Sequence, residues 1–340
     1  MKKSLFLIPV AALALAACSN DEVVEQNTTQ NQPKEIAFQA ITQPGTRAAV
    51  DGTAFPTTLD MKVAAYQVEA TGGSAGAYFD ATTFKYQFVG GSASGSGSYW
   101  GGETAKFWPL TPAYINFLAI ANANADNATG VTWGTNKADQ VTIVMSDNSG
   151  AQRDLMYARG NGAVTQSGNS LSFPDKVDME FKHAQAWIDF KVKANSTVET
   201  AITINSITLT GAKYNGTYTV THTAYNAKTG QSVAGAWSAL GSAQNIAVPG
   251  WSATALTTSF VTVGDGLMIV PDDAATGDFT SFTINYTFDG KTYEYTYTPA
   301  STQVEQAKHY IYEINFTLHE IYINPTVEDW ADQSATSVEI

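Results

Sequence analysis

Hydrophobic and polar residues alternate along much of the chain beyond residue 34, and segments with a helical period are few. Alternation puts every second side chain on one face, which is typical of a strand with one buried side. The clearest examples cover residues 36–38, 59–65, 141–145, 188–192 and 202–204. Loops rich in Thr, Ser, Gly and Asn separate them. The pattern predicts an all-β fold built from antiparallel β-sandwiches.

The clearest hairpin is expected over residues 282–297. Large apolar or aromatic residues occupy alternate positions over 282–288 and again over 293–297. Asp289-Gly290 lies between them and supplies a two-residue turn that tolerates positive φ. This combination favours two antiparallel strands joined by a tight turn.

A further alternating segment begins at Tyr310 and continues to Leu318, after which the pattern changes phase to Ile321 and Ile323. A shift of one residue moves every following side chain to the other face of the sheet. We therefore expect a bulge or bend near His319-Glu320.

The N-terminus has a different pattern. Lys2 and Lys3 precede an apolar run over residues 5–15, and two alanines then precede Cys18. The run is too short for a transmembrane helix, which needs about 20 residues, and is typical of a signal peptide. The tetrapeptide at 15–18 resembles the lipobox of bacterial lipoproteins. This predicts a signal over residues 1–17 and lipidation of Cys18; an ordinary secretory signal with an incidental cysteine is the alternative.

Composition narrows the possible functions. Cys18 is the only cysteine, so the chain can form no internal disulfide, CxxC redox pair or cysteine-based zinc site. The net charge of −13 argues against binding to nucleic acid or to an anionic membrane surface. No second apolar run approaches membrane-spanning length, so the lipid is the only expected membrane attachment.

The body of the protein is expected to be globular, because 44% of its residues are apolar and 14% are charged. Residues 18–33 are acidic and rich in amides, which predicts a solvated tether; the Asp21-Glu22 pair in it resembles a surface-export signal, with a plain charged linker as the alternative. The remaining length suggests two domains. We place them at 34–180 and 181–340, where a polar loop closes and a new apolar strand begins.

Catalytic signatures are weak. The four histidines are scattered without HExxH spacing, and there is no GxSxG motif. The Gly-rich loop at 90–97 lacks the following GK[ST] of a phosphate-binding loop. Asp272-Asp273 could bind calcium, but a turn after a strand is favoured. We expect no catalytic residue, no metal and no cofactor, and therefore not an enzyme.

Several segments, taken in order, resemble the fimbrillin family of Bacteroidetes, whose members are lipoprotein-derived pilus subunits. They span nearly the whole chain and comprise Ile36-Ala37-Phe38 with Thr46-Arg47, Tyr99-Trp100, Phe107-Trp108-Pro109 with 115–119, 154–158, Phe181-Lys182-His183-Ala184 with 188–192, 202–209 and Trp330. One departure is the polar Gln185, where the family more often has an apolar residue.

The resemblance implies two transthyretin-like antiparallel β-sandwich domains in tandem, and an assembly route. A trypsin-like Arg-specific protease would cut after Arg47 and leave Ala48 as the first residue. The first strand, with Ile36, Phe38 and Ile41, would then leave its groove for a strand from another pilus subunit. Arg47 follows a turn-prone segment in which a protease can reach the backbone; an ordinary surface arginine is the alternative.

The C-terminal segment is the donor strand that the resemblance implies. It holds apolar residues in short extended runs, with Tyr322, Ile323, Val327, Val338 and Ile340 as the candidate donor residues. A terminal strand that completes its own domain is the alternative. The expected location is the cell outer membrane before cleavage and the fimbrium afterwards, with a role in adhesion.

A surface lipoprotein that binds glycans is the competing function. Aromatic rings can stack on sugars, and four tryptophans near Gly or Ser are candidates for such contacts: Trp100, Trp133, Trp237 and Trp251. Packing of loops against the sandwiches is the structural alternative for these residues.

Overall fold

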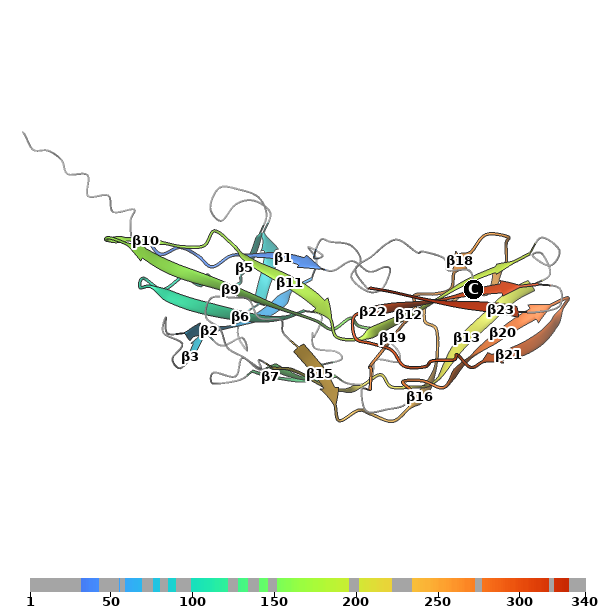
Figure 1. The fold of residues 1–340 in the computed structure, drawn as a ribbon. Helices are drawn as coiled ribbons and strands as arrows, with labels where there is room; N and C mark the ends of the chain where they lie inside the picture. The colour runs from blue at the N-terminus through green and yellow to red at the C-terminus, as the bar shows by residue number, and fades with distance from the viewer. Residues whose placement is uncertain are drawn as a thin grey trace, which may run out of the picture. The chain divides into compact units, whose positions relative to one another are not determined.

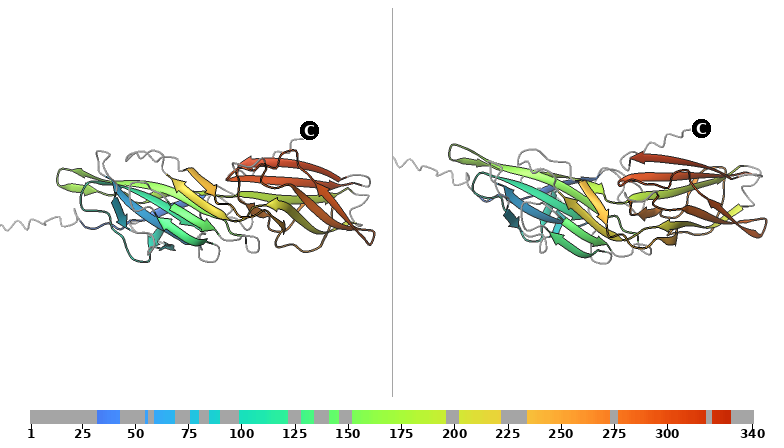
Figure 2. Two further views of the ribbon diagram at one scale, coloured as in Figure 1. Left: turned by 90° about the horizontal axis from the view of Figure 1, so that it is seen from below. Right: turned by 60° about the horizontal axis from the view of Figure 1, so that its bottom comes forward.

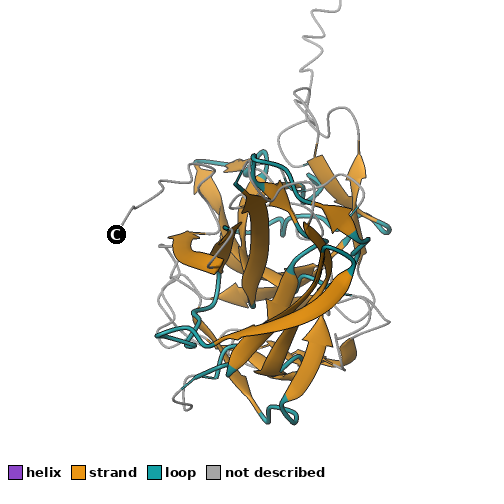
Figure 3. Ribbon diagram, turned by 90° about the vertical axis from the view of Figure 1, so that its right-hand side faces the viewer, coloured by secondary structure: helices purple, strands orange, loops and turns teal. Residues whose placement is uncertain are grey.

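The computed structural model describes residues 32–42, 55, 59–68, 76–79, 85–89, 99–121, 128–133, 141–145, 152–195, 202–221, 234–272, 277–317 and 321–329. Regular structure in these ranges consists of strands (Figure 3). They contain no helix, and thus none long and apolar enough to cross a membrane. The predicted all-β fold is confirmed.

The N-terminal strands form a nine-stranded sheet whose pairings close on themselves (Figure 1). Strand β6 pairs with both β2 and β9, and β1 pairs with both β11 and β5. The closed ring follows the order β1 (Phe38–Thr42), β5 (Tyr99–Gly102), β4 (Lys85–Val89), β2 (Met61–Val68), β6 (Ala113–Ala121), β9 (Met156–Ser167) and β11 (Val177–His183). Strands β3 (Gly76–Phe79) and β10 (Ser170–Ser172) extend it from β2 and β9.

An aromatic core fills this ring. Phe117 lies at its centre, because its ring packs edge-on against Phe38 at 5.1 Å and against Trp108 at 5.7 Å. The cluster draws its buried residues from 36–181 of the chain. Burial of each large apolar side chain contributes about 1.5–3 kcal/mol, so this core is the main stabilising element of the ring.

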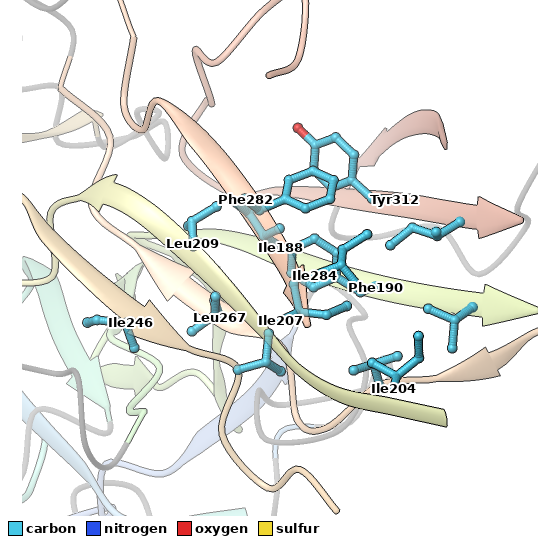
Figure 4. Packing of buried hydrophobic residues seen from close by; sticks show 14 of the residues in the cluster. Ile188, Phe190, Ile204, Ile207, Leu209, Ile246, Leu267, Phe282, Ile284 and Tyr312 are labelled. Atoms are coloured by element: carbon cyan, nitrogen blue, oxygen red, sulfur yellow. The ribbon is translucent and has the colours of Figure 1, made fainter. Parts of the chain in front are cut away.

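The C-terminal part is a sandwich of two sheets. One sheet holds β12 (Ala186–Ala194), β18 (Val261–Thr262), β19 (Leu267–Ile269), β22 (Lys308–Phe316) and β23 (Ile321–Asp329). The other holds β13 (Ile202–Ala212), β16 (Gln244–Ala247), β17 (Thr254–Ala255), β20 (Ser281–Phe288) and β21 (Lys291–Tyr297). Inward side chains from both sheets meet in a second core, which contains Phe190, Phe282 and Tyr312 (Figure 4).

A third set of pairings joins the two halves of the sequence. Hairpin β7–β8 (Ala128–Trp133 and Val141–Met145) comes from the N-terminal half, and hairpin β14–β15 (Gly216–Thr221 and Ala234–Ser238) comes from the C-terminal half. Strand β8 pairs antiparallel with β14, so the four strands make one sheet in the order β15-β14-β8-β7 (Figure 2).

Only Ala184 and Gln185 separate β11 of the ring from β12 of the sandwich. The Gln185 side chain is fully buried, and its Oε1 accepts a hydrogen bond from the Leu155 amide at 2.8 Å. The Trp237 indole donates to the Ala184 carbonyl at 2.6 Å. The polar residue at position 185 thus satisfies a buried backbone donor, although its own buried Nε2 has no hydrogen-bond partner among the described residues.

The predicted 282–297 hairpin is confirmed. Strands β20 and β21 pair from Phe288 opposite Lys291 to Phe282 opposite Tyr297. Asp289 and Gly290 both have positive φ, 48° and 73°, as a two-residue turn between twisted strands requires.

Two pairings depart from the antiparallel pattern that the sequence predicts. Strand β1 runs parallel to β11, and β12 runs parallel to β22. Alternation of side chains reports the two faces of a strand but carries no information about the direction of its neighbour. The N-terminal ring and the C-terminal sandwich therefore each contain one parallel pairing among antiparallel ones.

The bulge or bend expected near His319-Glu320 lies outside the described residues. Strands β22 and β23 pair antiparallel with Phe316 opposite Ile321. The two strands thus run in opposite directions, and the new phase after Leu318 belongs to a separate strand.

Gly162 on β9 leaves room for the buried Trp108 indole. A Cβ at this position would lie 2.3 Å from Trp108 Cη2, and the indole is held against Phe117. The Gly162→Ala variant should lose about 1–3 kcal/mol of stability by overpacking. Chemical denaturation followed by tryptophan fluorescence measures it, with the neighbouring Asn161→Ala as control. Equal midpoints for the two variants would contradict the close packing.

Candidate functional site

Strand β1 fills the gap between β11 and β5. It pairs with β11 along its whole length, from Phe38 opposite Val177 to Thr42 opposite Phe181. On its other side a single residue pair, Phe38 and Trp100, connects it to β5. The ring is therefore closed by one long contact and one short contact.

The chain just before β1 is also paired. The Ile36 amide donates to the Lys106 carbonyl at 2.6 Å, and the Trp108 amide donates to the Lys34 carbonyl at 2.9 Å. The Lys34 ammonium forms an ion pair with Asp175, which lowers the pKa of that carboxyl group. Burial raises the pKa of Glu35 between these contacts. The paired segment thus extends from residue 34 through β1.

Apolar residues of this segment are inserted in the ring core. Ile36 and Phe38 have no exposed surface and Ala40 is buried, whereas Gln39 between them is exposed. Burial of the Ile36 and Phe38 side chains contributes about 3–6 kcal/mol to the stability of the ring. Removal of the segment would therefore leave an apolar groove flanked by two unpaired strand edges.

Phe55 spans this gap from inside. Its side chain is 1% exposed, and its ring lies 4.4 Å from Phe181 on β11 and 5.4 Å from Trp100 on β5. These are the two strands that β1 separates. Phe55 follows residue 47 in the chain, so it stays with the ring if the chain is cut there. The sequence analysis missed this residue; the signal was one bulky apolar residue inside a turn-rich segment beside a proline.

The predicted residues fall into three groups. Ile36 and Phe38 lie together in the ring core, while Ile41 lies on β1 opposite Glu180. Tyr322, Ile323 and Val327 lie on β23, which belongs to the C-terminal sandwich. Cys18, Arg47, Ala48, Val338 and Ile340 lie outside the described residues.

Strand β23 completes a sheet of its own chain. It pairs with β22 over its full length and is the last strand in the order β18-β12-β22-β23. Ile321 and Ile323 pack against the sandwich core, whereas Val327 is 55% exposed. The N-terminal and C-terminal candidate strands therefore serve different cores in this structure and do not meet in one site.

Three of the four candidate tryptophans have structural contacts. Trp100 is buried in the ring core, the Trp237 indole donates to the Ala184 carbonyl, and Trp251 packs on the sandwich core. The side chain of Trp133 lies outside the described residues. These contacts are the loop and core packing that the sequence left open as the structural alternative.

The described histidines make contacts inside the fold, with a carboxylate or with an aromatic ring. His183 and Asp154 are fully buried and lie 2.8 Å apart. His309 stacks on Trp187 with ring centroids 4.0 Å apart. Within the described residues no three His, Cys, Asp or Glu side chains gather in a way that could hold a metal ion. Asp272, the described member of the calcium candidate, instead pairs with Lys213.

Comparison with known proteins decides the family. The model of the Fimbrillin-like family matches residues 46–330, well over half of the chain. The chain belongs to the Fimbrillin-like family. This is a family of structural adhesion proteins, not of enzymes. The match includes β2–β23, and the residues of β1 precede it.

Solved structures with similar folds include three from Bacteroides species. A candidate cell adhesion protein of Bacteroides ovatus has a TM-score of 0.51 at 14% identity, covering 89% of this chain and 100% of that one. Another, of Bacteroides uniformis, has a TM-score of 0.49 at 15% identity, covering 87% and 99%. A fimbrial protein of Bacteroides vulgatus has a TM-score of 0.45 at 17% identity, covering 86% and 99%. No curated protein matches.

Removal of the Phe55 ring should destabilise the ring of strands. Phe55→Ala deletes contacts to both flanking strands and should cost about 3–5 kcal/mol. Denaturant unfolding of the precursor, followed by tryptophan fluorescence near Trp100, measures the change. Phe107→Ala is the matched control, because the Phe107 side chain is 44% exposed. If Phe55→Ala lowers the free energy of unfolding no more than the control does, then β1 alone holds β11 and β5 together.

Proposed function

We propose that this chain is a pilus subunit, exported as a lipoprotein through Cys18, cleaved after Arg47 and polymerised by donor-strand exchange. The observation that carries this proposal is the position of β1. It is the first strand among the described residues, it closes the ring, and it ends five residues before Arg47. One cut in the intervening segment would therefore separate this strand from the rest of the protein.

The physics of the vacated groove favours polymerisation. Withdrawal of β1 exposes unpaired backbone groups of β11 and β5 and the apolar surface that contacts Ile36 and Phe38. A strand from another subunit restores the hydrogen bonds, and its alternate side chains fill the same positions. Donor and acceptor surfaces differ, so the contact is heterologous and extends into a filament.

We also propose the tandem organisation of two transthyretin-like domains, with residues 34–180 and 181–340 as their limits. The two buried clusters support this division, because one ends at Phe181 and the other begins at Ala186. The shared sheet β15-β14-β8-β7 and the buried Gln185 would act as the connection between the domains.

The cellular setting follows from the same route. Residues 1–17 direct export, Cys18 carries the lipid to the outer membrane, and residues 18–33 tether the precursor there. An Arg-specific protease and other pilus subunits are the partners. After cleavage the lipid, tether and β1 leave together, and the subunit becomes part of the fimbrium, where family membership supports a role in adhesion.

Cleavage is tested by N-terminal sequencing of the protein from the cell surface. Ala48 should be the first residue, and Arg47→Ala should leave the precursor lipidated and monomeric. Arg153→Ala is the control and should change neither the N-terminus nor the filaments. A surface protein that always begins at lipidated Cys18 would remove it from the class of cleaved pilins.

The donor is proposed to come from the C-terminal segment, whose candidate residues are Tyr322, Ile323, Val327, Val338 and Ile340. Deletion of residues 331–340 retains β23 in its own sheet, so the truncated chain should fold. It should remain monomeric after the cut at Arg47, as measured by size-exclusion chromatography and SDS-resistant ladders. Unchanged filaments would exclude residues 331–340 as the donor.

A further inference from the structure

The C-terminal sandwich contains a pocket of about 650 Å³ beside its edge strand. Its walls come from the segment 297–305, from β22 and from β23, and the argument below uses Tyr297, Ser301, Glu305, Tyr310, Tyr312 and Val327. The volume lies within the range of about 300–1,000 Å³ that is typical of small-molecule sites. The pocket shares no lining residue with β1 or with the ring core.

Hydrogen bonds fix the wall of this pocket in place. The Asp278 carboxylate accepts from the Asp272 amide at 2.5 Å and from the Val304 amide at 2.7 Å. The Tyr310 hydroxyl accepts from the Glu305 amide at 2.8 Å. These contacts hold the segment 297–305 without a ligand. Binding would therefore require little ordering of the protein.

The Tyr312 hydroxyl lines this pocket and lacks a hydrogen-bond partner among the described residues. The side chain is 3% exposed, and its ring packs on Phe190 and Phe282 with centroids 5.7 Å and 5.0 Å away. The hydroxyl oxygen points away from the core cluster (Figure 4). The hydroxyl oxygen is not fully enclosed by protein, so a polar ligand that enters the pocket can reach it and accept its hydrogen bond.

The lining favours a neutral ligand that carries many hydroxyl groups. Lys and Arg are absent from the described lining residues, while Glu305 and two aspartates are present, which disfavours anions. A cation is disfavoured as well, because Lys213 pairs with Asp272 and the Asp278 carboxylate already accepts two backbone amides. Burial raises the pKa of Tyr312, so its hydroxyl stays protonated and can donate to a ligand oxygen.

We propose that this pocket binds a neutral oligosaccharide. The Tyr312 hydroxyl donates to one sugar oxygen from the floor, and Glu305 and Ser301 at the opening accept from sugar hydroxyls. Tyr297 and Val327 supply apolar surface for the C–H faces of the rings. The site would give the subunit a ligand of its own, independent of its assembly into filaments.

The test uses the chain from residue 18 onwards, not cut at Arg47, with Cys18→Ser to prevent lipidation. It is applied to an array of neutral, sialylated and amino-sugar oligosaccharides, and the best neutral binder is then titrated calorimetrically. We expect binding to neutral oligosaccharides, weakened about three- to tenfold by Tyr312→Phe, since one hydrogen bond is lost while the ring packing remains. Glu305→Gln should weaken binding as well.

Tyr286→Phe is the matched control, because Tyr286 lies on β20 outside the pocket lining and should leave binding unchanged. Absence of binding to any neutral oligosaccharide would overturn the proposal. So would equal affinity in Tyr312→Phe and the parent chain, or displacement of the sugar by tetramethylammonium. Filament formation after cleavage at Arg47 tests the pilus proposal separately, so one proposal can fail without the other.

Discussion

Strand β1 is held to β11 along five residues and meets β5 at Phe38 alone, and the ring of the N-terminal strands closes through these two contacts. A strand inside the chain could leave such a ring only by unthreading the segments on both sides of it. β1 has ring strands on one side only, because it is the first strand among the described residues. A single backbone cut after β1 would therefore separate it from the other strands of the ring.

Removal of a closing strand would ordinarily let the two new edges drift apart or pair with the wrong partner. Phe55 opposes this, since its ring contacts Phe181 and Trp100 on the two edges and follows the proposed cut. On the side of the ring opposite β1, strand β6 is paired along its length with β2 and β9. After β1 leaves, β11 and β5 would therefore stay in position until a strand from another subunit binds between them.

Alternation was sufficient to predict several of the strands, the hairpin with its Asp289-Gly290 turn, and the strand that begins with Ile36 and Phe38. These features depend on residues close in sequence. The parallel pairing of β1 with β11 joins Phe38 to Val177, and Phe55 reaches Phe181. Contacts over such separations depend on how the whole chain folds, and the period of hydrophobic residues carries no record of them.

Strand β23 takes part in two features that compete. Its residues Pro325 and Val327 form one wall of the pocket, and it completes the sheet beside β22. If the donor segment included β23, the sandwich would lose an edge strand and the pocket would lose that wall. A donor confined to residues after 329 avoids both costs, because the nine-residue pairing with β22 stays intact. A subunit that polymerises and binds a ligand in this pocket therefore needs a donor strand that begins beyond β23.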